Sequence, residues 1–267
     1  MLEIYPIPAF SDNYIWCLVN PEDHSAFVVD PGDADPVEHY LEAHALTLKG
    51  VLITHFHPDH TGGLTNLLDK QNLIVYGPHP AQTNEAPNRV TEGCDLITNK
   101  VSEGEHIIIL GHTFTVYETP GHTLDHIVYF SDDLLTLFSG DTLFYGGCGR
   151  IFEGNPKMME QSLSKLSRLP PSTRVYCAHE YTQSNLQFAK HVEPNNKDLQ
   201  RHIDEASQLR QKGLPTLPSS IEVECMINPF LRSGETTVID SAIKQGCPDN
   251  PNKVDVFSCI RAWKDNF

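Results

Sequence analysis

The stretch THFHPDH, residues 54–60, constrains the fold most, because it gathers three histidines and an aspartate within seven positions. The apolar run at residues 51–53 leads into it. Polar side chains where an apolar strand ends are typical of a functional loop. Adjacent imidazoles cost folding free energy unless a ligand uses them, and zinc and iron prefer imidazole and carboxylate ligands. The stretch therefore predicts a metal site at the end of a strand.

The spacing within this stretch predicts how the ligands are arranged. His55 and His57 are two positions apart, so an extended segment places both rings on one side. Asp59 and His60 then lie around the turn into a helix. Four adjacent ligands do not comfortably bind one ion, but they can serve two. We expect the glycine pair at 62–63 to let the backbone turn closely behind the site.

Three further candidate ligands follow predicted strands. His122 lies in TPGHT, Asp141 in FSGDT and His179 in CAHEY. Two ions need about three protein ligands each plus shared groups, and a carboxylate can bridge them. The predicted sets are His55, His57 and His122 on one ion, Asp59, His60 and His179 on the other, and Asp141 between them. We expect the remaining nine histidines, His126 among them, to be ordinary surface or core residues.

Charge and composition exclude several classes of partner. The formal net charge of −16 repels nucleic acid and anionic membranes. No apolar stretch approaches the roughly 20 residues that a membrane helix needs. The first basic residue is Lys49, which argues against a secretory signal. The seven cysteines are widely spaced and odd in number, as expected for free thiols in the cytoplasm. We expect a monomer that acts on a small molecule.

Hydrophobic patterning predicts two domains that meet near residue 180. Up to that point short apolar runs alternate with turns, and after it the spacing is helical. We expect a β-rich catalytic domain at 1–180 and a helical domain at 181–267. The predicted strands are 26–30, 50–54, 73–76 and 175–178, with hairpins at 107–118 and 127–139. The predicted helices are 37–44, 64–70, 183–192, 198–212, 236–245 and 257–265.

The pattern HxHxDH, followed by single His, Asp and His residues at strand ends, resembles the metallo-β-lactamase superfamily. The resemblance implies an α+β fold: an αββα sandwich with the metal site at one edge, followed by a smaller all-helical C-terminal domain. Asp30 in VVDPGD matches an early aspartate of the superfamily. It either supports the ligands or forms an Asx turn at a strand end.

Four segments, IPAFSDNYIW, GGCGRIFEG, AHEYTQSN and RAWKDNF, resemble the glyoxalase II family of hydroxyacylglutathione hydrolases in its bacterial form. The resemblance implies hydrolysis of S-D-lactoylglutathione to glutathione and D-lactate, the second step of methylglyoxal detoxification. The helical domain then binds the substrate. The metals are two divalent ions, with zinc preferred over iron or manganese because the ligands suit all three.

The same resemblance assigns roles to individual residues. We expect Asp59 to bind metal and, as a mechanistic hypothesis, to orient the attacking water or accept its proton, with Asp141 as the second catalytic carboxylate. Arg261 and Lys264, three apart on one helix face, correspond to positions at the glycine carboxylate of glutathione. Arg150 corresponds to a basic position that contacts the peptide backbone of glutathione, and Tyr181 and Asn185 correspond to two further glutathione contacts. Phe152 stands where some members have tyrosine, which removes one hydroxyl contact and puts the affinity for glutathione in question.

Three rival interpretations remain open. A mononuclear-iron glutathione persulfide dioxygenase of the same superfamily is disfavoured by the long helical region with its basic pair. A nuclease of the same fold is disfavoured by the net charge of −16. A non-catalytic metal protein is disfavoured because a structural site is usually closed and mononuclear. Cys148 has no evident base in the sequence, so it is not the expected nucleophile.

Overall fold

The computed structural model describes residues 2–81 and 91–267 of the chain. Two compact units divide it: unit 1 comprises residues 1–118 and 125–140, and unit 2 comprises residues 119–124 and 141–267. The chain therefore leaves unit 1 briefly at residues 119–124 and finally at residue 141. The division into domains near residue 180 stays a prediction.

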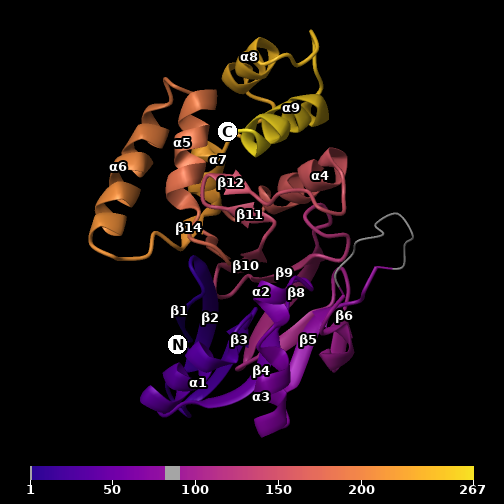
Figure 1. Ribbon diagram of the computed structural model, residues 1–267, viewed down its shortest axis with the longest axis vertical. Coiled ribbons are helices and arrows are strands. Elements are labelled where there is room, and N and C mark those ends of the chain that lie inside the picture. Colours follow the sequence, from indigo (N-terminus) through magenta and orange to yellow (C-terminus); the bar gives the residue numbers. More distant parts are fainter. Residues whose placement is uncertain (1, 82–90) are drawn as a thin grey trace. The chain divides into compact units, whose positions relative to one another are not determined.

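The first sheet of unit 1 contains six strands (Figure 1). In spatial order they are β1 (Glu3–Ala9), β2 (Asn13–Asn20), β3 (Ser25–Val29), β4 (Thr47–Leu52), β5 (Ile74–Pro78) and β6 (Asn99–Val101). The first three pair antiparallel. The last four pair parallel, so the loops that follow β3 and β4 leave the sheet at the same edge.

The N-terminal hairpin β1–β2 was not among the predicted elements. β1 contains Pro6 and Pro8, which lack the N–H that a central strand would donate. In the sheet β1 lies at the edge, where a proline costs least. β2 has no polar alternation because it is buried along all but its last residue.

The core of unit 1 lies between this sheet and the helices α1 (Ala34–Ala43) and α3 (Leu64–Lys70). The fully buried Val37 and Leu64 face β-strand residues such as Val51 and Val75 in one cluster. Burial of each such side chain stabilises the fold by about 1.5–3 kcal/mol. This packing fixes the ends of β3 and β4, and the stretch THFHPDH follows the second of these ends.

Four further strands of unit 1 pair antiparallel. Their spatial order is β10 (Thr136–Gly140), β9 (Ile127–Ser131), β8 (His112–Glu118) and β7 (His106–Ile109). Both predicted hairpins are confirmed. Gly111 makes the first turn with a positive φ of 86°, a conformation that glycine adopts without steric cost.

Unit 2 is mainly helical (Figure 1). Its helices are α4 (Pro156–Leu166), α5 (Thr182–Val192), α6 (Lys197–Gln211), α7 (Ile221–Ile227), α8 (Thr236–Lys244) and α9 (Lys253–Asp265). Its short strands are β11 (Leu143–Phe144), β12 (Gly147–Cys148), β13 (Arg174–Cys177) and β14 (Ser219–Ser220). The predicted helices beyond residue 181 are confirmed, and α5 runs beside α6.

Two helices of unit 2 were missed although their first turns carry signals. Asn155 caps α4 and Pro156 occupies its first turn. Ser220 caps α7 by accepting a hydrogen bond from the Val223 N–H. Both arrangements are favoured at helix starts. No helix in the described ranges combines the length and apolar character needed to span a membrane.

Candidate active site

The stretch THFHPDH follows β4 and is anchored to the neighbouring strand ends. The Ile53 N–H donates to the Tyr76 carbonyl at 2.8 Å. The Thr54 N–H and hydroxyl donate to the two oxygens of the Asp30 carboxylate at 2.8 and 2.7 Å. The chain then enters the short helix α2 (Pro58–Thr61). The predicted placement of the stretch at the end of a strand is confirmed.

Within unit 1 the four candidate ligands of this stretch lie close together. His55 Nε2 is 3.1 Å from His57 Nδ1. The ring centroids of His55 and His60 are 4.0 Å apart, and both side chains are fully buried. His60 Nε2 lies 3.5 Å from the Asp59 carboxylate. Buried imidazoles packed together in this way are an arrangement that a metal ion stabilises.

Asp30 supports this cluster from behind. Its carboxylate, besides accepting from Thr54, lies 3.0 Å from His60 Nδ1. The backbone of Asp30 has a φ of 52°, in the left-handed region that costs a non-glycine residue energy and that clusters at functional sites. Of the two interpretations left open by the sequence, the contact with His60 favours the supporting role. The second nitrogen of His60 is then oriented for a ligand.

The glycine pair at 62–63 permits a close backbone approach, as predicted. A Cβ atom on Gly62 would lie 2.6 Å from the Gly32 carbonyl oxygen. A Cβ on Gly63 would lie 2.6 Å from that of Pro31. Neither glycine has a positive φ. Glycine is therefore needed at both positions because a side chain would collide with the loop after β3, which carries Asp30.

Sequence reasoning overlooked His126, which was expected to be an ordinary histidine. Its side chain is fully buried and its ring stacks on His55, with centroids 4.8 Å apart and an interplanar angle of 24°. Gly140, with a φ of +48°, leaves room for it, since a Cβ there would lie 2.8 Å from His126 Nε2. A lone histidine before a strand gives no signal of such a contact. His126 limits how far the His55 ring can rotate.

Unit 2 brings together the other three candidate ligands. His122 Nε2 lies 3.4 Å from Asp141 Oδ2, and His179 Nε2 lies 3.3 Å from Asp141 Oδ1. All three side chains are buried. His122 Nδ1 is 2.7 Å from the Arg150 carbonyl, so an N–H at Nδ1 donates there and Nε2 remains for a ligand.

The two ligand sets suit a binuclear metal site by their chemistry. Together they hold five histidines and two aspartates, and each set contains buried imidazole beside carboxylate. These donors match divalent transition metals, and a carboxylate can serve two ions at once.

A cavity of about 420 Å³ in unit 2 is lined by the predicted substrate-binding residues. Two of the candidate metal ligands, His122 and Asp141, also line this cavity. The predicted residues that line it are Arg150, Tyr181, Asn185, Arg261 and Lys264. Phe152, 62% exposed, also lines it, and its ring lies 5.3 Å from that of His122. The sequence had not indicated Phe144 or Ser184, which complete part of the wall.

The basic residues of this cavity have unequal surroundings. Arg261 is only 6% exposed and donates to the Cys148 carbonyl at 3.0 Å and to Asp265 at 2.9 Å. Its Nε has no hydrogen-bond partner among the described residues. Asp265 also lies 3.4 Å from Arg150 Nε. One carboxylate, which the sequence did not single out, thus pairs with two predicted anchors.

Lys264 is the third basic residue of the cavity. Burial, together with the nearby charge of Arg261, lowers its pKa to about 8. Its ammonium group lies 5.2 Å from the centroid of the Phe188 ring, a cation–π distance. Lys264 is therefore charged at neutral pH but loses its charge within the range of ordinary assays.

The fold and its ligand sets define the class of protein. The family model of the metallo-β-lactamase superfamily matches residues 14–179, and that of the hydroxyacylglutathione hydrolase C-terminus matches residues 180–267. Hydroxyacylglutathione hydrolases of Pseudomonas fluorescens (strain SBW25) and Ectopseudomonas mendocina (strain ymp) are 46% and 48% identical, and each alignment covers all of both chains. The chain therefore belongs to the hydroxyacylglutathione hydrolase family.

A solved structure confirms the fold. TTHA1623, crystallised in a di-iron-bound form, superposes with a TM-score of 0.60 at 23% identity, over 85% of this chain and 100% of that chain. At this identity the likeness concerns the fold alone, which is the metallo-β-lactamase fold expected from the sequence.

Proposed function

We propose that the chain hydrolyses the thioester of S-(2-hydroxyacyl)glutathione, with S-D-lactoylglutathione as substrate and glutathione and D-lactate as products. The reaction is the second step of methylglyoxal degradation. Full-length relatives named hydroxyacylglutathione hydrolase support this proposal. The observation that carries it is the single cavity lined by all five predicted glutathione contacts together with His122 and Asp141.

The proposed metal site holds two divalent ions with the ligands that the sequence predicts. These are His55, His57 and His122 for one ion, Asp59, His60 and His179 for the other, and Asp141 as the shared ligand. All seven ligands fall within residues 14–179, the region that the superfamily model matches. Zinc is the proposed metal, with iron the first alternative because imidazole and carboxylate ligands suit both. Manganese suits the same ligands. Bound divalent ions supply acidification of water and stabilisation of negative charge on a carbonyl oxygen.

The chain's own residues contribute orientation and binding. Asn13 donates to the Asp59 carboxylate at 3.1 Å and so fixes the group proposed to orient water or accept its proton. The guanidinium of Arg261 and the ammonium of Lys264 line the cavity and are the proposed donors for the carboxylates of glutathione. The leaving thiolate has a parent pKa of about 8.5, so it departs without a strong general acid.

The pKa of Lys264 predicts a pH dependence of substrate binding. Because that pKa is about 8, the Lys264 side chain carries its positive charge below pH 8 and loses this charge as the pH rises through 8. We therefore expect kcat/KM for S-D-lactoylglutathione to fall above pH 8, chiefly through a rising KM. Lys264→Arg keeps its charge at every assay pH, so its KM should stay nearly constant from pH 7 to 9. Parallel profiles for both enzymes would remove Lys264 as the titrating group, since titration of the substrate affects both alike.

The alternative, a glutathione persulfide dioxygenase, is not favoured, because the relatives of this chain are named hydroxyacylglutathione hydrolase, and oxygen uptake distinguishes the two activities. The dioxygenase consumes oxygen, whereas thioester hydrolysis does not. We expect loss of the ultraviolet absorbance of S-D-lactoylglutathione and no oxygen uptake with glutathione persulfide. Rapid oxygen uptake with no thioester hydrolysis would replace the proposed function.

We also propose that the enzyme works as a monomer in the cytoplasm. All seven cysteines lie in the described ranges, and none of them is joined in a disulfide bond there, which fits a reducing compartment. The net charge of −16 disfavours association with nucleic acid or an anionic membrane.

A further inference from the structure

A short hairpin, residues 143–148, forms one wall of the cavity in unit 2. It consists of β11, a two-residue turn and β12. Phe144 and Cys148 from this hairpin line the cavity. The hairpin also connects Asp141, on its N-terminal side, with Arg150 on its C-terminal side. A displacement of the hairpin would therefore disturb the glutathione side of the cavity.

The two strands of this hairpin contain two residues each, so side chains from elsewhere must hold its main chain. Asn228 Nδ2 donates to the Gly147 carbonyl at 2.9 Å and to that of Phe144 at 3.4 Å. The Gly146 N–H donates to Glu224 Oε2 at 2.9 Å. Asn185 Nδ2 donates to the Tyr145 carbonyl at 3.2 Å.

Glu224 is the centre of this hydrogen-bond network. Its side chain is fully buried. Besides the Gly146 N–H, it accepts from Asn228 Nδ2 at 2.9 Å and from the Ser219 hydroxyl at 2.6 Å. Without the Glu224 carboxylate, the Gly146 N–H would be a buried donor without a partner, and Asn228 would lose the contact that orients its amide. One side chain thus determines two attachments of the hairpin.

We propose that Glu224 is a positioning residue for substrate binding, holding the 143–148 hairpin in place as a wall of the glutathione cavity. The identity of the ligand rests on the proposed function. Glu224 lies outside the cavity lining, so it acts through Gly146 and Asn228. Glutamine can reproduce its contacts: the amide oxygen accepts from Gly146 and Asn228, and the amide nitrogen donates to the Ser219 hydroxyl.

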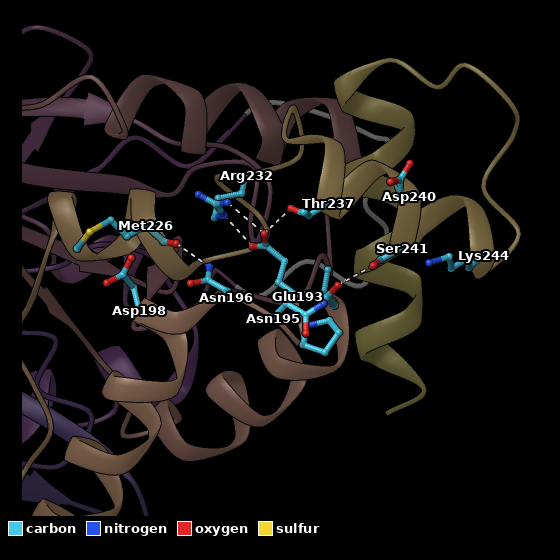
Figure 2. Close-up of a pocket in the computed structure, with 12 residues that line it drawn as sticks. Glu193, Asn195, Asn196, Asp198, Met226, Arg232, Thr237, Asp240, Ser241 and Lys244 are labelled. Carbon is cyan, nitrogen blue, oxygen red and sulfur yellow. Dashed lines mark hydrogen bonds and ion pairs between the residues drawn. The ribbon is translucent and has the colours of Figure 1, made fainter.

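Glu193 offers a matched control in the same unit. It is also buried, at 4% exposed, and its carboxylate accepts from Arg232 at 2.7 and 3.1 Å and from Thr237 at 2.6 Å (Figure 2). These partners line a different cavity of about 490 Å³, and none of the predicted site residues is among its lining residues. Loss of Glu193 should destabilise unit 2 without moving the hairpin.

The test compares Glu224→Ala, Glu224→Gln and Glu193→Ala with the full-length, metal-loaded wild type. KM and kcat are measured with S-D-lactoylglutathione. The dissociation constant of S-methylglutathione, a thioether that cannot be hydrolysed, is measured by calorimetry. We expect Glu224→Ala to raise KM and this constant about tenfold or more, with a smaller change in kcat. Glu224→Gln should restore both values to within about twofold of wild type.

The control separates positioning from general stability. Glu193→Ala should lower the thermal midpoint but leave KM near the wild-type value. The inference is wrong if folded Glu224→Ala keeps the wild-type KM and dissociation constant, or if Glu193→Ala raises both of these values as much as Glu224→Ala does. Should Glu224→Ala fail to fold, a Glu224→Gln variant with a strongly raised KM would also overturn it. Hydrolysis by the wild type tests the proposed function separately, because the inference depends only on ratios between variants.

Discussion

Replacing Asp141 with alanine is expected to lower kcat for S-D-lactoylglutathione about a hundredfold or more and to reduce the bound metal. Asp141 is buried between His122 and His179, with one carboxylate oxygen near each imidazole. Its removal takes away the proposed bridging ligand and the charge that compensates the ions. The measurements are steady-state kinetics and metal content by elemental analysis.

Asp133 supplies the control for this substitution. It also pairs with a histidine, since its carboxylate lies 2.6 Å from His112 Nδ1, but the pair is at the surface and its side chain is 54% exposed. Asp133→Ala should therefore keep wild-type turnover and metal content. Wild-type turnover and metal content in Asp141→Ala would mean that Asp141 is not a ligand, and the proposed site would be wrong.

Replacing Arg261 with alanine is expected to raise KM about tenfold or more and also to destabilise the fold by about 3 kcal/mol. The first effect follows from losing a cationic donor in the cavity. The second follows from burial: the guanidinium holds the Cys148 carbonyl and lies 5.0 Å from the centroid of the Phe230 ring. The sequence indicated only a contact of Arg261 with the substrate, because its burial could not be recognised there.

Urea unfolding and substrate kinetics separate the two roles of Arg261. Arg174, which is exposed and lies over the Tyr176 ring, is a suitable control, since Arg174→Ala should change neither KM nor stability by much. Arg261→Lys should recover part of the affinity but not both hydrogen bonds that the planar guanidinium donates, to the Cys148 carbonyl and to Asp265. A destabilised Arg261→Ala with the wild-type KM would make Arg261 purely structural.

The features that could be predicted from the sequence are local. The run before His55 and the turn residues around His122 follow from strand and loop chemistry, and the helix Leu64–Lys70 was predicted to its last residue. The need for space at Gly62 and Gly63 was also correct, although its cause is the loop that carries Asp30.

The features that were missed depend on contacts between distant residues. His126 is 71 positions from His55, and Glu224 is 78 positions from Gly146. Asp265 pairs with Arg150 across more than a hundred residues. Nothing local distinguishes such side chains from ordinary core or surface residues. β1 was missed because its prolines oppose a strand except at a sheet edge, and edge position is itself a property of the tertiary fold.

The most direct test of the proposed function is hydrolysis of S-D-lactoylglutathione by the purified chain, before and after metal removal with a chelator. The thioester absorbs in the ultraviolet, so its loss reports hydrolysis continuously. We predict rapid hydrolysis that the chelator abolishes and that added zinc, iron or manganese restores. No hydrolysis by a protein shown to contain two metal ions, or hydrolysis that persists in metal-free protein, would contradict a binuclear thioester hydrolase.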